Sequence, residues 1–340
     1  MNLFDRVNAF ITLGNILRSL PEAEFQAIAK KAHQENGWFT EESVTLAMRG
    51  INVLLDGTRL KGWVSSYSLE PASPKTVGVA MAGNIPLVGF QDFLAVLISG
   101  HRLKYKPSSK DSVLLDYVQQ KLIEIEPRFA DYTTAGDHLK GVDAIIATGS
   151  DNTSRYFEYY FRDIPHIIRN NRVSCGVIQG GETASELVLL GEDIFGYYGL
   201  GCRNVSFVFV PQALELPSFL DHLKSFDRVL DNHKYTNNYT YQKSLAMLNQ
   251  EPFLDTGFLL VKENKSLVSP VATLHYSVYK TLDELKSQLV RQQEKIQVVV
   301  SALGWYEGSI PFGTAQLPQV NDFADRVDTL RFLSTLNGPN

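Results

Sequence analysis

Apolar side chains in the first 70 residues recur at the spacing of helices. Residues three or four positions apart lie on one face of a helix. The first run of this kind comprises Phe4, Val7, Phe10, Leu13 and Leu17. Pro21 follows that run, a second run begins at Phe25, and residues 40–43 form a start signal for a third helix. The pattern predicts an N-terminal helical segment over residues 1–70.

From residue 71 onward, short β-rich runs alternate with helical patterns. We expect strands at residues 76–81, 101–106, 142–148 and 173–178. Between them we expect helices at residues 87–98, 108–123 and 154–161. Strands of continuous apolar residues that alternate with helices are typical of parallel sheets built from βαβ units.

A second α/β block is expected from about residue 180. Its expected elements are a short helix at residues 193–198, strands at 206–210, 258–261, 271–279 and 297–302, and a helix at 282–293. An Asn- and Tyr-rich stretch at residues 231–241 interrupts the block. Three interpretations of this stretch stay open, as a lid, a surface loop or a contact between subunits. The whole pattern predicts an α/β fold with two lobes.

Composition and charge narrow the class of protein. The 340 residues are 44% hydrophobic and 20% charged, which excludes an intrinsically disordered chain. The formal charge is -5 with both signs interspersed, so we expect no nucleic-acid partner. The longest apolar runs fall far short of the ~20 residues of a membrane helix, and Asp5 stands where a signal peptide is basic. Two cysteines cannot form a disulfide framework, so we expect a cytoplasmic protein.

Several common signatures are missing from the sequence. It has no G-x-x-x-x-G-K-[ST], no H-E-x-x-H, no G-x-S-x-G and no paired C-x-x-C, so we expect no metal site. Gly199 and Gly201 superficially suggest a dinucleotide-binding loop. However, Asn204 stands where the third glycine is needed, and the segment leads into a strand instead of a helix.

Cys202 is the residue with the clearest chemical interest. It follows Gly201 on an expected turn between a helix and a buried strand, where glycines let the backbone pass close to a ligand. Arg203 would lower the pKa of the thiol if its side chain lay nearby. Two interpretations of Cys202 stay open, as a nucleophile or as a small core residue. Cys175, within an expected strand, is interpreted as a core residue.

Three turns at the ends of expected strands bear further candidates. Asn84 follows the first strand, Lys106 ends the second, and Gly149 and Ser150 follow the third. Asn84 is able either to cap the next helix or to donate its amide to an oxyanion. Lys106 is either a solvated lysine or a contact for ribose hydroxyls and phosphate.

Together these motifs resemble the aldehyde dehydrogenase superfamily and, within it, the LuxC-type acyl-CoA reductases. The similarity extends over about residues 76–333 and is most specific in AGNIP and GYYGLGCRNVS. Other matching stretches are SGHRLKYKPS, ATGSD, IQGGET and the closing run at residues 311–333, which has Phe323 where the family has tyrosine.

The resemblance implies an aldehyde-dehydrogenase-like fold with two lobes, parallel sheets and an N-terminal helical segment. The implied domains are residues 1–70, a nucleotide-binding domain at 71–178, a catalytic domain at 179–315 and a tail at 316–340. The implied activity is reduction of an acyl-CoA, with a long-chain fatty acyl group favoured, to the aldehyde with release of CoA. Relatives with this fold commonly form dimers or tetramers, so a homo-oligomer is expected.

The resemblance also implies roles for single residues. Cys202 matches the nucleophile that takes the acyl group, and Asn84 matches the oxyanion-hole amide, with the backbone N–H of Cys202 as the second donor. Lys106, Gly149 and Ser150 match contacts to the nicotinamide cofactor. NAD-preferring relatives often have a glutamate two residues after the proline that follows the lysine. Here Ser109 and Lys110 stand in that region, which favours NADPH while NADH remains possible.

Departures from the family leave the direction of the reaction open. If Gly180 and Gly181 are the paired glycines of the family, Ile178 replaces the glutamate that activates hydrolytic water, which disfavours oxidation of aldehyde to acid. Glu182 and Glu186 lie nearby, and either is a candidate proton donor. The alternatives to an acyl-CoA reductase are an NAD(P)-dependent aldehyde dehydrogenase and a non-catalytic binding protein on the same scaffold.

Overall fold

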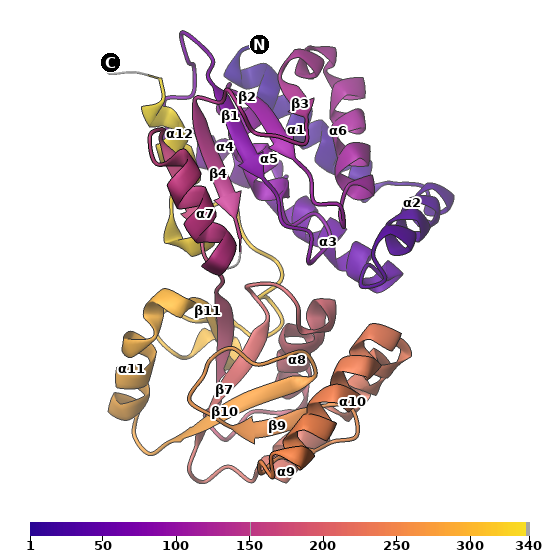
Figure 1. Ribbon diagram of the computed structural model, residues 1–340, viewed down its shortest axis with the longest axis vertical. Helices are drawn as coiled ribbons and strands as arrows, with labels where there is room; N and C mark the ends of the chain where they lie inside the picture. Colours follow the sequence, from indigo (N-terminus) through magenta and orange to yellow (C-terminus); the bar gives the residue numbers. More distant parts are fainter. Residues whose placement is uncertain (150, 338–340) are drawn as a thin grey trace. The chain divides into compact units, whose positions relative to one another are not determined.

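The computed structural model describes residues 1–149 and 151–337, the side chains of residues 151–153 excepted. The chain forms two compact units (Figure 1). Unit 1 comprises Met1–Asn171 together with Leu317–Asn340, and unit 2 comprises Arg172–Gln316. The chain therefore leaves unit 1 once and returns to it at the C-terminal end.

The N-terminal segment of unit 1 is helical, as the spacing of its apolar residues predicts. Its helices are α1 (Leu3–Arg18), α2 (Glu22–Glu35), α3 (Glu41–Leu54) and α4 (Gly57–Val64). Side-chain oxygens of Asn2, Thr40 and Asp56 accept backbone N–H groups at the starts of α1, α3 and α4. Such caps satisfy donors that a helix start leaves without partners.

The sheet of unit 1 is parallel, with strand order β3-β2-β1-β4-β5. Its strands are β1 (Thr76–Ala80), β2 (Arg102–Lys106), β3 (Thr133–Ala135), β4 (Ala144–Thr148) and β5 (His166–Arg169). The connecting helices are α5 (Phe90–Ile98), α6 (Val113–Ile125) and α7 (Asp151–Phe161). The expected βαβ units are confirmed, although the sequence pattern did not reveal the short strands β3 and β5.

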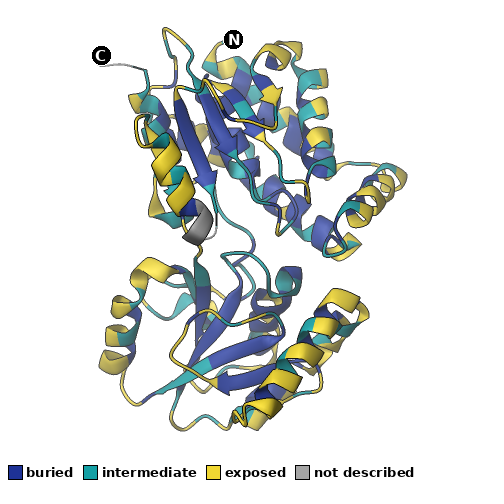
Figure 2. Cartoon of the chain, in the orientation of Figure 1, coloured by how far each residue is buried: buried dark blue, intermediate teal, exposed yellow. Residues whose placement is uncertain are grey.

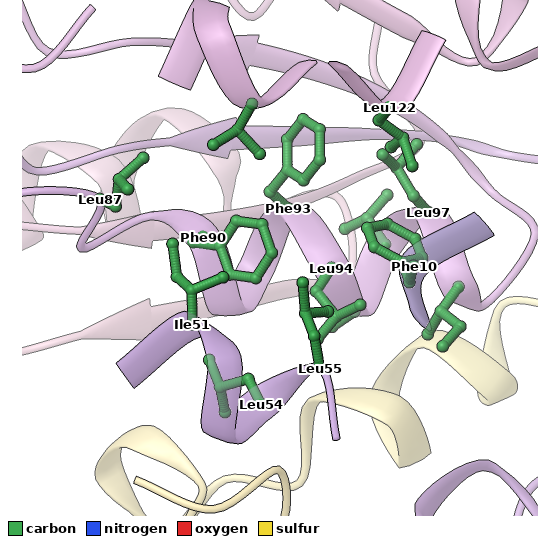
Figure 3. Close-up of a cluster of buried hydrophobic side chains, with 14 of the residues drawn as sticks. Phe10, Ile51, Leu54, Leu55, Leu87, Phe90, Phe93, Leu94, Leu97 and Leu122 are labelled. Atoms are coloured by element: carbon green, nitrogen blue, oxygen red, sulfur yellow. The ribbon is translucent and has the colours of Figure 1, made fainter. Parts of the chain in front are cut away.

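Both faces of this sheet are covered, as Figure 2 shows by the dark blue of its strands. On β4, Ala144 and Ile146 join the large core that includes α1, α3 and α5, whereas Ile145 and Ala147 join a smaller cluster under α7. Successive strand residues point to opposite faces, which explains this alternation. Figure 3 shows how α5 and the loop before it supply much of the large core, with Leu87, Phe90, Phe93, Leu94 and Leu97 drawn together with Phe10 of α1 and Ile51 of α3.

The sheet of unit 2 has the strand order β12-β11-β6-β7-β10-β9-β8. Its strands are β6 (Val173–Val177), β7 (Val205–Pro211), β8 (Leu254–Asp255), β9 (Leu260–Glu263), β10 (Thr273–Tyr279), β11 (Ile296–Ser301) and β12 (Ile310–Pro311). The ladders are parallel except for the pairing of β8 with β9 at one edge. The second α/β block is therefore confirmed.

The helices of unit 2 correct two expectations. They are α8 (Ala184–Phe195), α9 (Leu216–Asp221), α10 (His233–Leu248) and α11 (Leu282–Arg291). The helix expected at residues 193–198 is instead the end of α8 followed by the tight turn η2 (Gly196–Gly199). The Asn- and Tyr-rich stretch lies mostly in α10, so the interpretation as a surface loop is wrong. Asn232 caps α10, and Tyr235 and Tyr239, one turn apart, bury the side that packs inward.

The segment after residue 316 packs in unit 1. It ends in α12 (Thr329–Thr335), whose Leu330 and Leu333 are fully buried in the large core beside α5. The ring of His101 at the start of β2 forms a hydrogen bond of 3.0 Å with the carbonyl oxygen of Leu333. The remaining short turns are η1 (Pro127–Asp131), η3 (Lys224–Asp231), η4 (Gln293–Lys295), η5 (Ala302–Gly304) and η6 (Ala324–Arg326). Across the part of the chain that the structure describes, we find no helix with the length and apolar character to span a membrane.

Candidate active site

Unit 1 brings its candidate residues together at one edge of the sheet. β1 lies between β2 and β4, with Ala80 in register with Lys106 on one side and Ala147 on the other. Because the strands are parallel, the loops that follow them emerge at the same edge. Asn84, Lys106, Ser109 and Lys110 are exposed there, and Gly149 is half-buried. Ser150, the remaining cofactor-binding candidate, lies outside the described residues.

The loop that carries Asn84 is tied to the loop after β2. The side chain of Asn36, at the end of α2, donates to the carbonyl oxygens of Gly83 and Lys110 at 3.4 Å each. Gly83 also has no room for a Cβ atom, which would overlap the side chain of Ser108. The loops that follow β1 and β2 are therefore held against each other at the carboxyl ends of these strands.

Asp111 fixes the other end of the Asn84 loop. Its Oδ2 accepts the backbone N–H of Leu87 at 2.7 Å, while Leu87 has a left-handed φ of 56° and a side chain buried in the core. Burial raises the pKa of the Asp111 carboxyl to about 8, against the lowering effect of the Leu87 N–H. The helix-cap interpretation of Asn84 is wrong, since the N-cap of α5 is Gly89.

The strand order of unit 1 has a switch point between β1 and β4, where successive connections leave in opposite directions. In open α/β sheets, ligands bind in the crevice outside the carboxyl ends of the strands at such a point. The exposed amide, hydroxyl and ammonium groups of this edge suit a ligand with phosphate and ribose groups. Within the described residues, no group of His, Cys, Asp and Glu side chains is arranged to hold a metal ion.

In unit 2, Cys202 lies on a turn with an unusual backbone. Tyr197, Tyr198, Gly199 and Gly201 all have left-handed φ angles, of 51°, 59°, 81° and 96°. The left-handed region costs a non-glycine residue about 1 kcal/mol or more, so surrounding contacts must hold the two tyrosines. Tyr197 is buried, and the ring of Tyr198 packs on that of Tyr235 with the centroids 6.2 Å apart.

Contacts also fix the backbone on both sides of the thiol. The hydroxyl of Ser174, at the start of β6, donates to the carbonyl oxygen of Cys202 at 3.1 Å. The side-chain Nε of Arg203 donates to the carbonyl oxygen of Ala315. Cys202 itself is partly exposed, whereas Cys175 is fully buried and its pKa is raised by that burial. The interpretation of Cys175 as a core residue is confirmed.

The three residues weighed for acid–base chemistry lie at the opposite edge of the sheet from Cys202. β6 and β7 run parallel, so Ile178 follows the carboxyl end of β6 whereas Cys202 precedes the amino end of β7. Ile178 is fully buried. Glu182 accepts the backbone N–H groups of Gln179, Gly180 and Gly181, and Glu186 forms a capping box with Thr183.

These positions separate the two glutamates from the thiol. Helix α8 has 12 residues and a length of about 18 Å, and it separates Glu182 and Glu186 at its start from the Cys202 turn after its end. The hydrogen bonds from the backbone and hydroxyl of Thr183 lower the pKa of Glu186, which favours its ionised form. The expectation that Ile178 stands beside the thiol in the position of a base is therefore wrong, and residue 178 does not discriminate between the two reaction directions.

Comparison with known proteins places the fold. No protein-family model matches the sequence, and no curated protein matches it. Aldehyde dehydrogenase 21 from Physcomitrella patens, in complex with the reaction product succinate, has a TM-score of 0.69 at 11% identity, with 98% of this chain and 84% of that chain covered. Aldehyde dehydrogenase from Bacillus cereus in complex with NAD+ has a TM-score of 0.62 at 13% identity, with 88% and 72% covered.

A third structure extends the likeness to an enzyme with a different cofactor. An NADP dependent enzyme of E. coli has a TM-score of 0.65 at 12% identity, with 88% of this chain and 73% of that chain covered. At such identities the likeness shows the fold alone. The chain therefore has an α/β fold of the aldehyde dehydrogenase type with parallel sheets, and the expected fold class is confirmed.

Sequence reasoning missed three residues that shape the two loops. Asp111 holds the Asn84 loop, Ser174 holds the Cys202 carbonyl, and Asp193 on α8 accepts two backbone N–H groups from residues 313 and 315. All three are nearly fully buried. Their types and spacing resemble those of ordinary surface residues, so no pattern in the sequence indicates their burial.

Proposed function

We propose that this protein is an NADPH-dependent acyl-CoA reductase that converts an acyl-CoA to the aldehyde through a thioester on Cys202. The observation that supports this most directly is the partly exposed thiol on a left-handed turn of an aldehyde-dehydrogenase-type fold. A thiol that is conformationally held and accessible suits nucleophilic attack on a carbonyl carbon. A long-chain fatty acyl group remains the favoured substrate from the sequence resemblance.

The proposed chemistry has two stages at Cys202. The thiolate attacks the carbonyl carbon of the acyl-CoA, a carbon–sulfur bond forms, and CoA leaves as its thiolate. A reduced nicotinamide supplies the hydride that reduces the acyl-enzyme. The hydride adds to the carbonyl carbon of the acyl-enzyme, and the resulting alkoxide collapses to the aldehyde as the carbon–sulfur bond breaks and the Cys202 thiolate is released. The one proton that the overall reaction consumes, from solvent or a nearby acid, goes to the CoA thiolate that left in the first stage. Asn84 and the backbone N–H of Cys202 are proposed as donors to the oxygen that becomes negatively charged.

The proposed cofactor contacts lie at the edge of the unit 1 sheet. Lys106 and the Gly149–Ser150 turn are assigned to the ribose and phosphate groups, and Lys110 to a 2′-phosphate. Exposed ammonium groups at the carboxyl end of β2, next to the end of β1 that borders the switch point, support this assignment. The absence of a carboxylate at Ser109 supports NADPH over NADH, since a carboxylate there would repel the 2′-phosphate.

Oxidation of an aldehyde to its acid is the second candidate, because the structures named above include aldehyde dehydrogenases bound to NAD+ or to an acid product. A hydrolytic aldehyde dehydrogenase needs a base beside the acyl-enzyme. Glu182 and Glu186, the two glutamates weighed as proton donors, lie at the far end of α8, so neither is assigned to the acyl-enzyme in either reaction. The reductase stays the first candidate on the sequence resemblance. A homo-oligomeric state and a cytoplasmic location stay predictions.

The decisive experiment follows NADPH oxidation by the purified protein with a series of acyl-CoAs of increasing chain length. We expect turnover in the native protein and its loss, by at least about 10³-fold, in Cys202→Ala. Mass spectrometry of the intact protein with acyl-CoA and no NADPH should find the acyl group on Cys202. Cys175→Ala is the matched control, since this thiol is buried in the core and should leave kcat unchanged.

Two other results would decide against the reductase. Consumption of aldehyde and NAD(P)+ that does not need CoA would favour the aldehyde dehydrogenase. If the protein shows neither activity, and Cys202 reacts with iodoacetamide no faster than a free thiol, a non-catalytic binding protein would be favoured.

The cofactor assignment has a separate test in the loop after β2. In Lys110→Ala we expect the KM for NADPH to rise about tenfold while the KM for NADH stays unchanged, because only NADPH has a 2′-phosphate. Ser109→Glu should shift preference towards NADH, since a carboxylate binds ribose hydroxyls and repels phosphate. Lys30→Ala, an exposed lysine on α2, is the control. Equal effects of Lys110→Ala on both cofactors would remove the proposed contact.

A further inference from the structure

The segment at residues 312–316 crosses both ends of the turn that carries Cys202. The turn leaves α8 after Phe195 and enters β7 at Val205. At its first end, Asp193 lies in the last turns of α8, and its carboxylate accepts the backbone N–H groups of Gly313 at 2.7 Å and Ala315 at 2.9 Å. At its second end, the Nε of Arg203 donates to the carbonyl oxygen of Ala315.

The side of α8 that holds this segment is closely packed. Leu189 lies one helical turn before Asp193, so the two side chains share a face. Gly313 has a left-handed φ of 77°, and a Cβ atom there would lie 2.9 Å from Cδ2 of Leu189. The other end of the segment is fixed by a hydrogen bond of 3.1 Å from the backbone N–H of Phe312 to the carbonyl oxygen of Ser301 in β11. The segment therefore has little freedom to move away from Asp193.

Burial of the Asp193 carboxyl at this position costs free energy of folding. Asp193 is 1% exposed, and a buried carboxylate costs free energy unless its oxygens are hydrogen-bonded. Both oxygens are bonded here, one to each N–H group. Burial raises the pKa of Asp193 to about 7, while the two N–H groups and the charge of Arg203 lower it. The two N–H groups of the segment therefore offset part of the free-energy cost of burying this carboxyl.

We propose that Asp193 is a positioning residue, which holds the strained turn of residues 196–204, and thus the Cys202 thiol, through the backbone of residues 313–315. The turn contains two tyrosines in the left-handed region, so it would relax if its ends were free to separate. Asp193 fixes the end at α8 to the segment, and Arg203 fixes the end next to Cys202 to the same segment. Its effect on catalysis rests on the proposed function, whereas its effect on the turn does not.

The test uses hydrogen exchange of the full-length protein, measured by peptide mass spectrometry. In Asp193→Asn, only one side-chain oxygen remains to accept a backbone N–H group of residues 313 and 315. The side-chain NH2 then faces the other backbone N–H group, which is also a donor. We expect amide exchange in residues 196–204 to accelerate about tenfold relative to the native protein. Glu192→Gln, an exposed neighbour on α8, should leave exchange unchanged. Arg203→Lys keeps the charge but removes the Nε donor, and we expect it to accelerate exchange in the same turn.

Kinetics then separate positioning from general destabilisation. Asp193→Asn should lower the rate at which Cys202 acquires the acyl group by about tenfold, with the KM for NADPH unchanged and cooperative unfolding retained. Faster exchange confined to residues 312–316, with the turn as in the native protein, would overturn the proposal. If native Cys202 acquires no acyl group, the proposed function fails, and the exchange measurement still decides the role of Asp193.

Discussion

At the scale of single residues, the two thiols differ only in what surrounds them. Cys175 and Cys202 are two residues of one type, yet one lies fully buried in the core of unit 2 and the other is partly exposed on a turn. The strand pattern around Cys175 predicted its burial correctly, whereas the role of Cys202 as a nucleophile, inferred from its glycine neighbours and the family resemblance, stays a prediction. The contacts that hold Cys202, from Ser174 and Arg203, come from residues whose partners only the fold brings close.

Asp111 gives a prediction about stability and pH. Its folded pKa of about 8 lies above the value of about 4 in an unfolded chain, so the folded state binds the proton more tightly. The stability that this proton provides is fully present below pH 4 and is lost as the pH rises towards 8. Asp111→Asn cannot titrate, so its stability relative to the native protein should rise by about 2–3 kcal/mol between pH 5.5 and pH 8.

Urea unfolding of both proteins at the two pH values measures this difference. A relative stability that stays constant with pH would mean that the carboxyl is not desolvated in the folded state. Asp137→Asn, an exposed carboxyl in unit 1, is the control and should show no such trend.

At the scale of elements, α8 organises the candidate catalytic unit from both ends. Its first turn is closed by the capping box of Thr183 and Glu186, and its last turns hold Asp193. The capping signal T-x-x-E is visible in the sequence, but the sequence did not show that this cap lies at the end of α8 away from Cys202. Glu186 was a candidate proton donor because it follows the paired glycines, and the length of α8 places it away from Cys202.

The capping box predicts a loss of stability for one substitution and an unchanged turnover for another. Thr183→Ala should lower the free energy of unfolding by about 1 kcal/mol, because a backbone N–H of the first turn loses its acceptor. Glu186→Gln keeps an oxygen for the Thr183 N–H and should leave kcat within about twofold of the native value. Steady-state turnover measures the second effect. A loss of about 10²-fold or more in Glu186→Gln would instead identify Glu186 as the acid.

At the scale of the whole molecule, the two units differ in how the chain builds them. Unit 2 is one continuous stretch, Arg172–Gln316, whereas unit 1 needs Leu317–Asn340 in addition to Met1–Asn171. The C-terminal segment contributes Val320, Leu330 and Leu333 to the core of unit 1. Folding of unit 1 therefore depends on residues that follow unit 2 in the chain.

This arrangement predicts that a chain ending at residue 316 loses stability in one unit only. Burial of a large apolar side chain contributes about 1.5–3 kcal/mol, so the loss of three such side chains should cost unit 1 roughly 5 kcal/mol or more. Hydrogen exchange should accelerate in β1 and α5 and stay near the native rate in β10 and α11. Equal acceleration in both units would show that they unfold as one.

The sequence by itself determined the α/β class, the order of most helices and strands, and the two loops worth chemical attention. These features depend on the spacing of apolar residues, on helix caps and on glycine turns, and each of these involves only residues that are close together in the sequence. Short strands such as β3 and β5, and the helical state of the Asn- and Tyr-rich stretch, were not predicted because pairing and burial, rather than pattern, stabilise them.

Only the tertiary structure decided which edge of each sheet a residue occupies. The parallel pairing of β6 with β7 placed Ile178, Glu182 and Glu186 away from Cys202, although all four lie within 25 residues of one another. The same packing brought residues 313–315 to Asp193 across more than 100 positions of sequence. Proximity in the chain and proximity in space differ here because the 12-residue helix α8 carries the backbone across the unit before it reaches the thiol.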